Sequence, residues 1–198
     1  MSSVRFPYGI RIHGRGGQGV VTMAALLAGA AFDSGFEAQA FPSFGSERMG
    51  APVTAFCRIS TTPIQARDPV GRPDAVILCD PTLLHHVDVF AGLAADGTAL
   101  LNSSRPVPEL GVGELVAGYP ARRVLAVPAT DLARELTGRP IPNSALLGAF
   151  AAATGLIPIE AVERAVRRRF AGPLGDGNAR TARAGFDLVV ERMVSADA

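Results

Sequence analysis

Hydrophobic and polar positions follow strand-like and helix-like patterns in turn along the chain. Alternation at residues 9–13 predicts a first strand, and a run rich in Ala, Leu and Met predicts a buried helix at residues 20–32, which Gly35 ends. Residues 75–79 are apolar throughout, as in a central parallel strand that is buried on both faces. Strands that alternate with helices predict an α/β fold.

The remaining pattern extends this scheme to the end of the chain. Further strands are predicted at residues 37–41, 53–59, 98–101 and 124–127, with residues 62–65 as an antiparallel addition to the third strand. Helices are predicted at residues 83–95, 130–136, 144–153, 159–170 and 179–194. We expect one domain over residues 1–198: a Rossmann-like open, mostly parallel sheet with helices on both faces and a helical C-terminal third.

Composition limits the possible partners of the chain. Of its 198 residues 48% are hydrophobic and 19% charged, which suits a folded core, and the net charge of +1 argues against a nucleic-acid partner. No apolar stretch approaches the ~18 residues of a membrane span, and the N-terminus lacks the apolar segment of a signal peptide. We therefore expect no membrane contact and a cytoplasmic location.

Two residue counts exclude several kinds of chemistry. All 19 basic residues are Arg, so the chain has neither a Walker-A lysine nor a Schiff-base lysine. Cys57 and Cys79 lie in apolar runs and are expected to be buried thiols; two thiolates cannot hold an iron–sulfur cluster that takes four. No spacing suggests a nucleophile–base pair or a metal site, so we assign no catalytic residue and no metal ligand.

A glycine-rich motif lies between the first predicted strand and the first helix. It has the pattern G-x-G-x-x-G and consists of Gly14, Arg15, Gly16, Gly17, Gln18 and Gly19. Glycines allow a ligand to approach the backbone, and a helix N-terminus offers free N–H groups to an anion, so the motif predicts a phosphate or pyrophosphate site. Arg15 favours an anionic ligand, although the glycines could also serve helix–sheet packing alone.

A dinucleotide is the first alternative ligand for such a motif. Dinucleotide-binding folds place an acidic residue at the end of the second strand, whereas here Asp33 and Glu37 fall at or before its start and Phe41, Pro42 and Ser43 form its end. The missing acidic residue argues against a dinucleotide, and a free-standing NAD- or flavin-binding Rossmann oxidoreductase is kept as the alternative hypothesis.

A second notable stretch, residues 41–53, follows the carboxyl end of a predicted strand, where ligands bind in open α/β sheets. It contains two aromatic residues, two glycines and the adjacent pair Glu47 and Arg48. Considered alone, the stretch favours an irregular surface loop in which Glu47 and Arg48 are solvated.

Together these stretches resemble the gamma subunit of the 2-oxoacid:ferredoxin oxidoreductases of the pyruvate/ketoisovalerate type. The match runs through residues 14–22, 41–53, 79–83 and 142–149, and Asn178 is similar to a late Asn of the family. The chain has Ser46 and Met49 where the family commonly has Pro and Arg.

The resemblance implies a role in the oxidative decarboxylation of a 2-oxoacid to an acyl-coenzyme A. Thiamine diphosphate with Mg²⁺ and [4Fe–4S] clusters would belong to partner subunits of alpha, beta and delta type, and electrons would pass to ferredoxin or to a flavin- or NAD-linked subunit. This chain would contribute the coenzyme A-associated domain and be inactive alone. Pyruvate, branched 2-oxoacids, 2-oxoglutarate and aromatic acids such as phenylglyoxylate all remain possible substrates.

The resemblance also implies roles for individual residues. The loop from Gly14 to Gly19 would hold the pyrophosphate of coenzyme A through backbone N–H groups, with Arg15 adding charge. The other implied cofactor-site residues are Ser43, Phe44, Glu47, Arg48, Asn143 and Asn178. Of these, Glu47 and Arg48 would order their loop against the thiamine-bearing subunit, and Asn143 also stands where a helix N-cap is expected.

Overall fold

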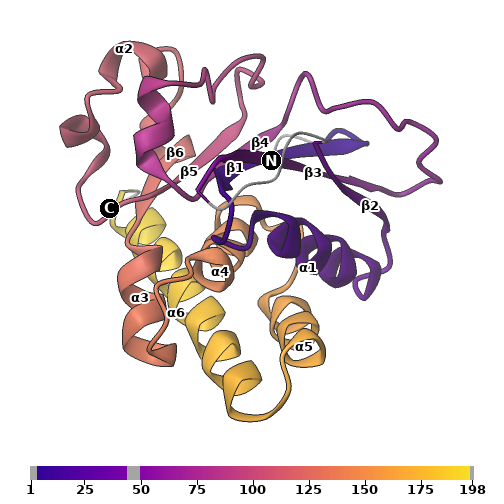
Figure 1. Ribbon diagram of the computed structural model, residues 1–198. Helices are drawn as coiled ribbons and strands as arrows, with labels where there is room; N and C mark the ends of the chain where they lie inside the picture. The colour runs from indigo at the N-terminus through magenta and orange to yellow at the C-terminus, as the bar shows by residue number, and fades with distance from the viewer. Residues whose placement is uncertain (1–3, 44–49, 197–198) are drawn as a thin grey trace.

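Six strands form one mixed sheet in the computed structural model, which describes residues 4–43 and 50–196 (Figure 1). The order across the sheet is β2-β3-β1-β4-β5-β6. The strand bounds are Tyr8–Arg15 for β1, Glu37–Pro42 for β2, Pro52–Ser60 for β3, Ala75–Leu78 for β4, Thr98–Asn102 for β5 and Val124–Val127 for β6.

The parallel part of the sheet comprises β1, β4, β5 and β6, and β3 runs antiparallel to both β1 and β2. Because β3 reverses direction between its two neighbours, β2 and β1 point the same way although they are not paired. The carboxyl ends of β1, β2, β4, β5 and β6 therefore lie at one edge of the sheet, which is where ligands bind in open α/β folds.

Helices cover both faces of the sheet, but the long ones all lie on one face (Figure 1). These are α1 Val20–Phe32, α3 Ala129–Thr137, α4 Asn143–Thr154, α5 Ile159–Arg169 and α6 Gly172–Ala196. On the opposite face the described part of the chain forms only short elements, which are η1 Pro81–His85, η2 Val107–Leu110, α2 Gly113–Val116 and η3 Ala121–Arg123. The expected α/β fold with a helical C-terminal third is confirmed.

Alternation along the strands divides the core into two layers. Ile10, Ile12 and Ile77 point to the long helices and belong to the larger apolar cluster. Val76 and Leu78 point to the opposite face, where they pack in a second cluster under the short helices. Since side chains alternate between the faces of a strand, the fully apolar β4 supplies both layers, as its sequence predicts.

Helices α4 and α6 approach each other more closely than any side chain would allow. A Cβ on Gly148 of α4 would lie 1.7 Å from the carbonyl oxygen of Ala182, and a Cβ on Gly185 of α6 would lie 2.1 Å from that of Ala145. Both glycines lie inside helices, where glycine normally lowers stability, so packing rather than helix propensity explains them. This contact holds α4, including its N-terminus, at a defined position against α6.

Three predicted elements differ from the structure. Residues 83–95 do not form a helix: η1 ends at His85 and turns follow, because Val89, Phe90 and Leu93 fill the second core layer instead of following one helical face. Residues 62–65 form no strand, since β3 ends at Ser60. Helix α6 begins at Gly172 rather than at residue 179.

The α4–α6 contact predicts a large effect from one methyl group. Gly148→Ala should lower the free energy of unfolding by at least ~3 kcal/mol, because its Cβ meets backbone that cannot rotate away. Gly29→Ala is the matched control within α1: its Cβ would meet only the end of the Arg168 side chain at 3.9 Å, so it should be neutral or stabilising by up to ~1 kcal/mol. Urea unfolding of both variants tests this, and equal midpoints would refute it.

Candidate functional site

The glycine motif lies at the carboxyl edge of the sheet and joins β1 to α1. Gly14 and Arg15 still belong to β1, and Gly19 is the N-cap of α1 with φ of 76°, a left-handed conformation that glycine adopts without strain. A Cβ on Gly14 would lie 2.5 Å from Cγ2 of Val20, so this glycine lets the helix start directly against the strand. The predicted strand–loop–helix arrangement is thus present.

The loop leaves several backbone N–H groups free. The N–H of Gly16 donates to the carbonyl of Ala51 at 2.9 Å and that of Gln18 to the carbonyl of Arg15 at 3.1 Å. Five other N–H groups have no acceptor within residues 4–43 and 50–196; they belong to Gly17, Gly19, Val20, Val21 and Thr22. Unpaired N–H groups and the positive end of the helix dipole favour an anion at this point.

The N-terminus of α4 meets the N-terminus of α1 at the same place. A Cβ on Gly19 would lie 2.8 Å from Nδ2 of Asn143, the first residue of α4. Asn143 is only 3% exposed. Its Oδ1 accepts the N–H of Ser144 at 2.7 Å, while its Nδ2 has no acceptor in the described part of the chain. An unpaired amide donor of a nearly buried residue therefore faces the glycine loop between two helix N-termini, both of which attract negative charge.

Asn178, in contrast, uses both ends of its amide inside the protein. Its Oδ1 accepts the hydroxyl of Ser144 at 2.8 Å, and its Nδ2 donates to the carbonyl of Leu174 at 2.9 Å. It lies within α6 rather than ahead of it. Ser144 is fully buried, so Asn178 and Ser144 together brace the start of α4. The predicted Asn143 and Asn178 are thus brought together, with only Asn143 presenting a free donor.

The side chain of Arg15 is held by the protein itself. Its Nε donates to Oδ2 of Asp80 at 3.1 Å, Nη2 to the hydroxyl of Thr82 at 2.8 Å and Nη1 to the carbonyl of Gly50 at 3.1 Å. Its charge is therefore balanced by Asp80, which limits what Arg15 can add to the binding of an anion.

Asp80 connects this arrangement to the loop. Its Oδ2 also accepts Nε2 of Gln18 at 3.0 Å, and Oε1 of Gln18 accepts the N–H of Arg15 at 2.8 Å. Its Oδ1 accepts the N–H and the hydroxyl of Thr82 at 3.0 and 2.6 Å. Burial alone would raise the pKa of Asp80, but the hydrogen bonds from Thr82 and Gln18 and the charge of Arg15 outweigh it and keep that pKa below its ordinary value.

The second predicted stretch is only partly described. Ser43 is exposed, and its N–H donates to the carbonyl of Thr54 on β3 at 2.8 Å. Because β3 lies between β2 and β1, Ser43 is separated from Gly14 by a whole strand. Phe44, Glu47 and Arg48 lie outside the described residues.

The site includes residues that motif reading did not assign. Asp80 and Thr82 hold the glycine loop, and Ser144 orients two asparagines. Their sequence signals are weak: Asp80 follows a buried strand and precedes Pro81, a common start for a capped helical turn, and Ser144 merely follows Asn143.

A buried pair of basic side chains lies next to the loop on β1. Nε of Arg11 donates to Nε2 of His13 at 3.0 Å, and further donors of Arg11 reach the carbonyls of Val89 and Ala91. Burial, and then the charge of Arg11, lowers the pKa of His13 to about 4. His13 is therefore neutral near pH 7 and serves as an internal acceptor for Arg11.

A cavity of about 620 Å³ lies at the other edge of the sheet, at the amino ends of its strands. It is lined by Tyr8, Asp74 and Arg123 among others, and Asp74 is already bound by Arg5 at 3.1 Å and by the N–H of Gly9 at 2.8 Å. The glycine loop, the free N–H groups and Asn143 are all at the carboxyl edge, so we place the candidate site there.

The donors at the glycine loop are suited to a phosphate group, and the described residues offer little for other kinds of ligand. Within the described residues we find no group of three metal-ligating side chains and no helix that is long and apolar enough to cross a membrane. The chain's two thiols, Cys57 and Cys79, are buried and unpaired, and burial raises the pKa of each to about 12. The unpaired groups identified at the glycine loop and on Asn143 are donors, which suits the binding of an anion.

Comparisons with known proteins agree on one family. The model of the family described as pyruvate ferredoxin/flavodoxin oxidoreductase matches residues 9–188. The pyruvate/ketoisovalerate oxidoreductases common subunit gamma of Pyrococcus abyssi is 51% identical over 178 residues, which cover 90% of this chain and 95% of that protein. The pyruvate synthase subunit PorC of Methanothermobacter thermautotrophicus is 44% identical over 186 residues, covering 94% and 98%.

A solved structure shows the same fold. The crystal structure of pyruvate oxidoreductase subunit PORC from Thermotoga maritima superposes with a TM-score of 0.77 at 36% sequence identity. The match covers 91% of this chain and 95% of that one.

The Asp80 contacts predict a stability effect. Asp80→Ala removes the acceptor of Arg15, Gln18 and Thr82 and should lower the free energy of unfolding by about 3 kcal/mol. Asp131→Ala is the control, because Asp131 pairs with Arg134 where both side chains are more than half exposed, and should change it by less than about 0.5 kcal/mol. Equal losses in chemical unfolding would contradict the bracing role of Asp80.

The low pKa of His13 predicts a dependence of stability on pH. Between pH 6.5 and about 4 the unfolded chain binds a proton at this position that the folded chain does not. The contribution of His13 to the free energy of unfolding should therefore decrease by about 1.4 kcal/mol for each unit by which the pH is lowered, and it should be constant above pH 7. His13→Gln keeps an acceptor for Arg11 and should remove this contribution. Urea midpoints from pH 7.5 to 5 test it, and parallel profiles for the two proteins would exclude it.

Proposed function

The chain belongs to the pyruvate ferredoxin/flavodoxin oxidoreductase family, and from this premise we propose that it is the gamma subunit of a 2-oxoacid oxidoreductase that binds coenzyme A. In this proposal residues 1–198 act as one domain of a larger complex. The complex would release carbon dioxide and two electrons from a 2-oxoacid and transfer the acyl group to the coenzyme A thiol.

One observation supports this function above the others: the N-termini of α1 and α4 converge on Gly19, and an unpaired amide donor of Asn143 lies between them. Coenzyme A carries a diphosphate, and helix N-termini bind phosphate through backbone N–H groups. The free N–H groups of Gly17 and Gly19 and Nδ2 of Asn143 would hold that diphosphate. Gly14 and Gln18 would shape the loop, and Asn178 would act through Ser144.

The electron-transfer groups are assigned to other subunits. Cys57 and Cys79 are both fully buried, and two thiolates cannot ligate a [4Fe–4S] cluster. In the proposal, partner subunits of alpha, beta and delta type hold these clusters and thiamine diphosphate with Mg²⁺, which supply electron transfer and decarboxylation. Ferredoxin or a flavin- or NAD-linked subunit accepts the electrons. The unpaired thiols agree with action in the cytoplasm, a reducing compartment.

The alternative of a free-standing NAD- or flavin-binding enzyme has less support. In dinucleotide-binding folds the strand with the ribose-binding acid lies beside the first strand. Here β3 separates β2 from β1, and β2 ends at Pro42 without an acidic residue. Within residues 4–43 and 50–196, the acidic group that would bind the ribose of a dinucleotide is therefore not placed beside the loop.

Purification of the native complex tests the assignment. Expression of the tagged chain with its genomic neighbours should yield a complex that contains thiamine diphosphate and iron, reduces an electron acceptor with a 2-oxoacid and forms an acyl-coenzyme A. A chain that purifies alone and binds NAD or a flavin tightly would favour the alternative.

The Asn143→Asp variant should weaken the binding of coenzyme A without lowering the stability of the protein. The aspartate keeps the acceptor for the N–H of Ser144 and suits a helix N-terminus, so the melting temperature should hold or rise. It replaces the free donor with a negative charge, so the Kd of the complex for coenzyme A should rise by about tenfold or more. Calorimetry on the complex measures this, and an unchanged Kd would mean that the diphosphate does not bind at Asn143.

A further inference from the structure

A single cation on the loop before α4 stands out at the rim of the candidate site. This loop, residues 138–142, joins α3 to α4 and contains Arg139. We infer that Arg139 binds the 3′-phosphate of coenzyme A and makes the site selective for the 3′-phosphorylated form. This inference rests on the proposed function and adds a specificity determinant to it.

The backbone around Arg139 is fixed on both sides. The N–H of Arg139 donates to the hydroxyl of Thr137 at 3.2 Å, and its carbonyl accepts the N–H of Ile141 at 2.9 Å. Gly138 ends α3 with φ of 73°, and the loop also contains Pro140 and Pro142, whose rings restrict the backbone further. The Cα of Arg139 is thus held in place although its side chain is exposed, which lowers the entropy cost of binding.

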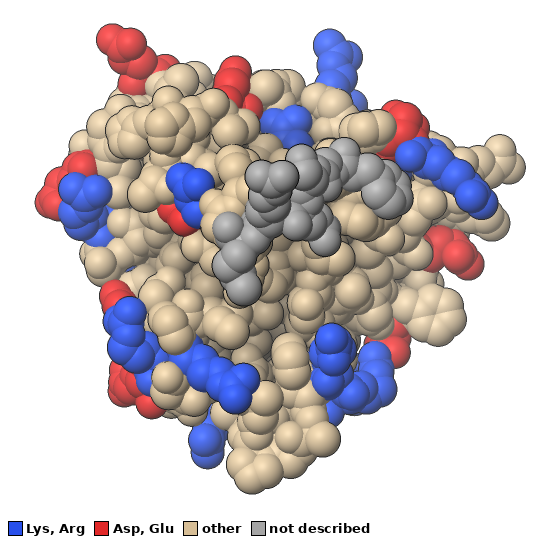
Figure 2. All heavy atoms as spheres, viewed as in Figure 1, with Lys and Arg blue, Asp and Glu red and all other residues tan. Residues whose placement is uncertain are grey.

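The same loop forms a wall of the anion site. Cγ2 of Ile141 would lie 3.6 Å from a Cβ on Gly19, and Asn143 follows two residues later. Arg139 is therefore two residues from a side chain that touches the N-cap of α1, within reach of a long side chain. In Figure 2 basic side chains over α3 and α6 border one side of a recess, and others over α5 border its opposite side.

Two other arginines near the loop are already paired, whereas Arg139 is not paired within the described part of the chain. Asp80 balances Arg15, and Arg134, one turn earlier on α3, pairs with Asp131 at 3.0 Å. Arg139 forms no ion pair with any carboxylate of the described residues. Neutral N–H groups suffice for a diphosphate at two helix N-termini, whereas a terminal phosphate dianion is matched best by a guanidinium, which can donate two parallel hydrogen bonds.

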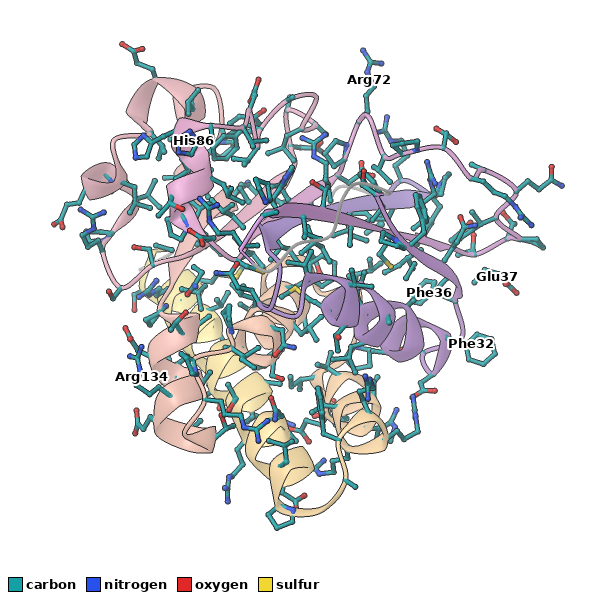
Figure 3. All side chains as sticks on the ribbon, in the orientation of Figure 1. Phe32, Phe36, Glu37, Arg72, His86 and Arg134 are labelled. Carbon is teal, nitrogen blue, oxygen red and sulfur yellow. The ribbon has the colours of Figure 1, made fainter. Side chains whose placement is uncertain are left out.

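The experiment compares two ligands in three forms of the native complex. Calorimetry gives the Kd for coenzyme A and for 3′-dephospho-coenzyme A with the wild type, Arg139→Gln and Arg134→Gln. Figure 3 shows the control residue Arg134 on the outer side of α3. Arg139→Gln should weaken coenzyme A by about 10- to 100-fold and leave the dephospho form unchanged, because only one phosphate loses its partner. Arg134→Gln should change neither Kd by more than about twofold.

Turnover adds a second measurement. In the Arg139→Gln complex the KM for coenzyme A should rise while kcat at saturating coenzyme A stays the same, since the 3′-phosphate is at the opposite end of coenzyme A from the reacting thiol. A wild-type complex that binds neither ligand would refute the proposed function itself. A wild type that binds coenzyme A, with an Arg139→Gln variant that keeps the same preference or weakens both ligands equally, would refute the role of Arg139 alone.

Discussion

The backbone contact between α4 and α6 determines the position of the candidate site. With glycines at positions 148 and 185 the two helices meet without intervening side chains, and α4 is drawn inward until Asn143 reaches the N-cap of α1. Ser144 and Asn178 add a hydrogen bond between the same two helices at that end. The close packing of α4 on α6 therefore also places the amide donor of Asn143. A shift of α4 along α6 would separate the N-terminus of α4 from that of α1.

Among the described residues, positive potential at the glycine loop comes mainly from backbone groups, because the two arginines of β1 are already bound within the protein. Asp80 balances the charge of Arg15, and backbone carbonyls surround the guanidinium of Arg11. What remains are backbone N–H groups, the dipoles of two helices and an amide. Such dipoles are fixed by the fold, so they need little reorganisation when an anion binds, whereas a flexible side chain would lose conformational entropy.

The parts of the structure that the sequence predicts correctly are those with strong local signals. Helix α1 has the predicted bounds because its apolar run, the glycine motif before it and Gly35 after it all agree. The family predicted from the ordered motifs is confirmed by the family model. The segment after β4 does not form the predicted helix, because its apolar residues pack in the second core layer, a tertiary effect. The free donor of Asn143 could not be predicted from the sequence either, since it depends on the distance between α4 and α1.

The position of β3 explains how a dinucleotide-like motif can serve a different ligand. Insertion of an antiparallel strand between β1 and β2 moves the end of β2 away from the glycine loop, so an acidic residue there could not reach a ribose bound at α1. The space beside the loop is bounded instead by α4 and the loop before it. The G-x-G-x-x-G pattern thus specifies only how a phosphate meets a helix N-terminus, and the neighbouring element decides which phosphate compound is accepted.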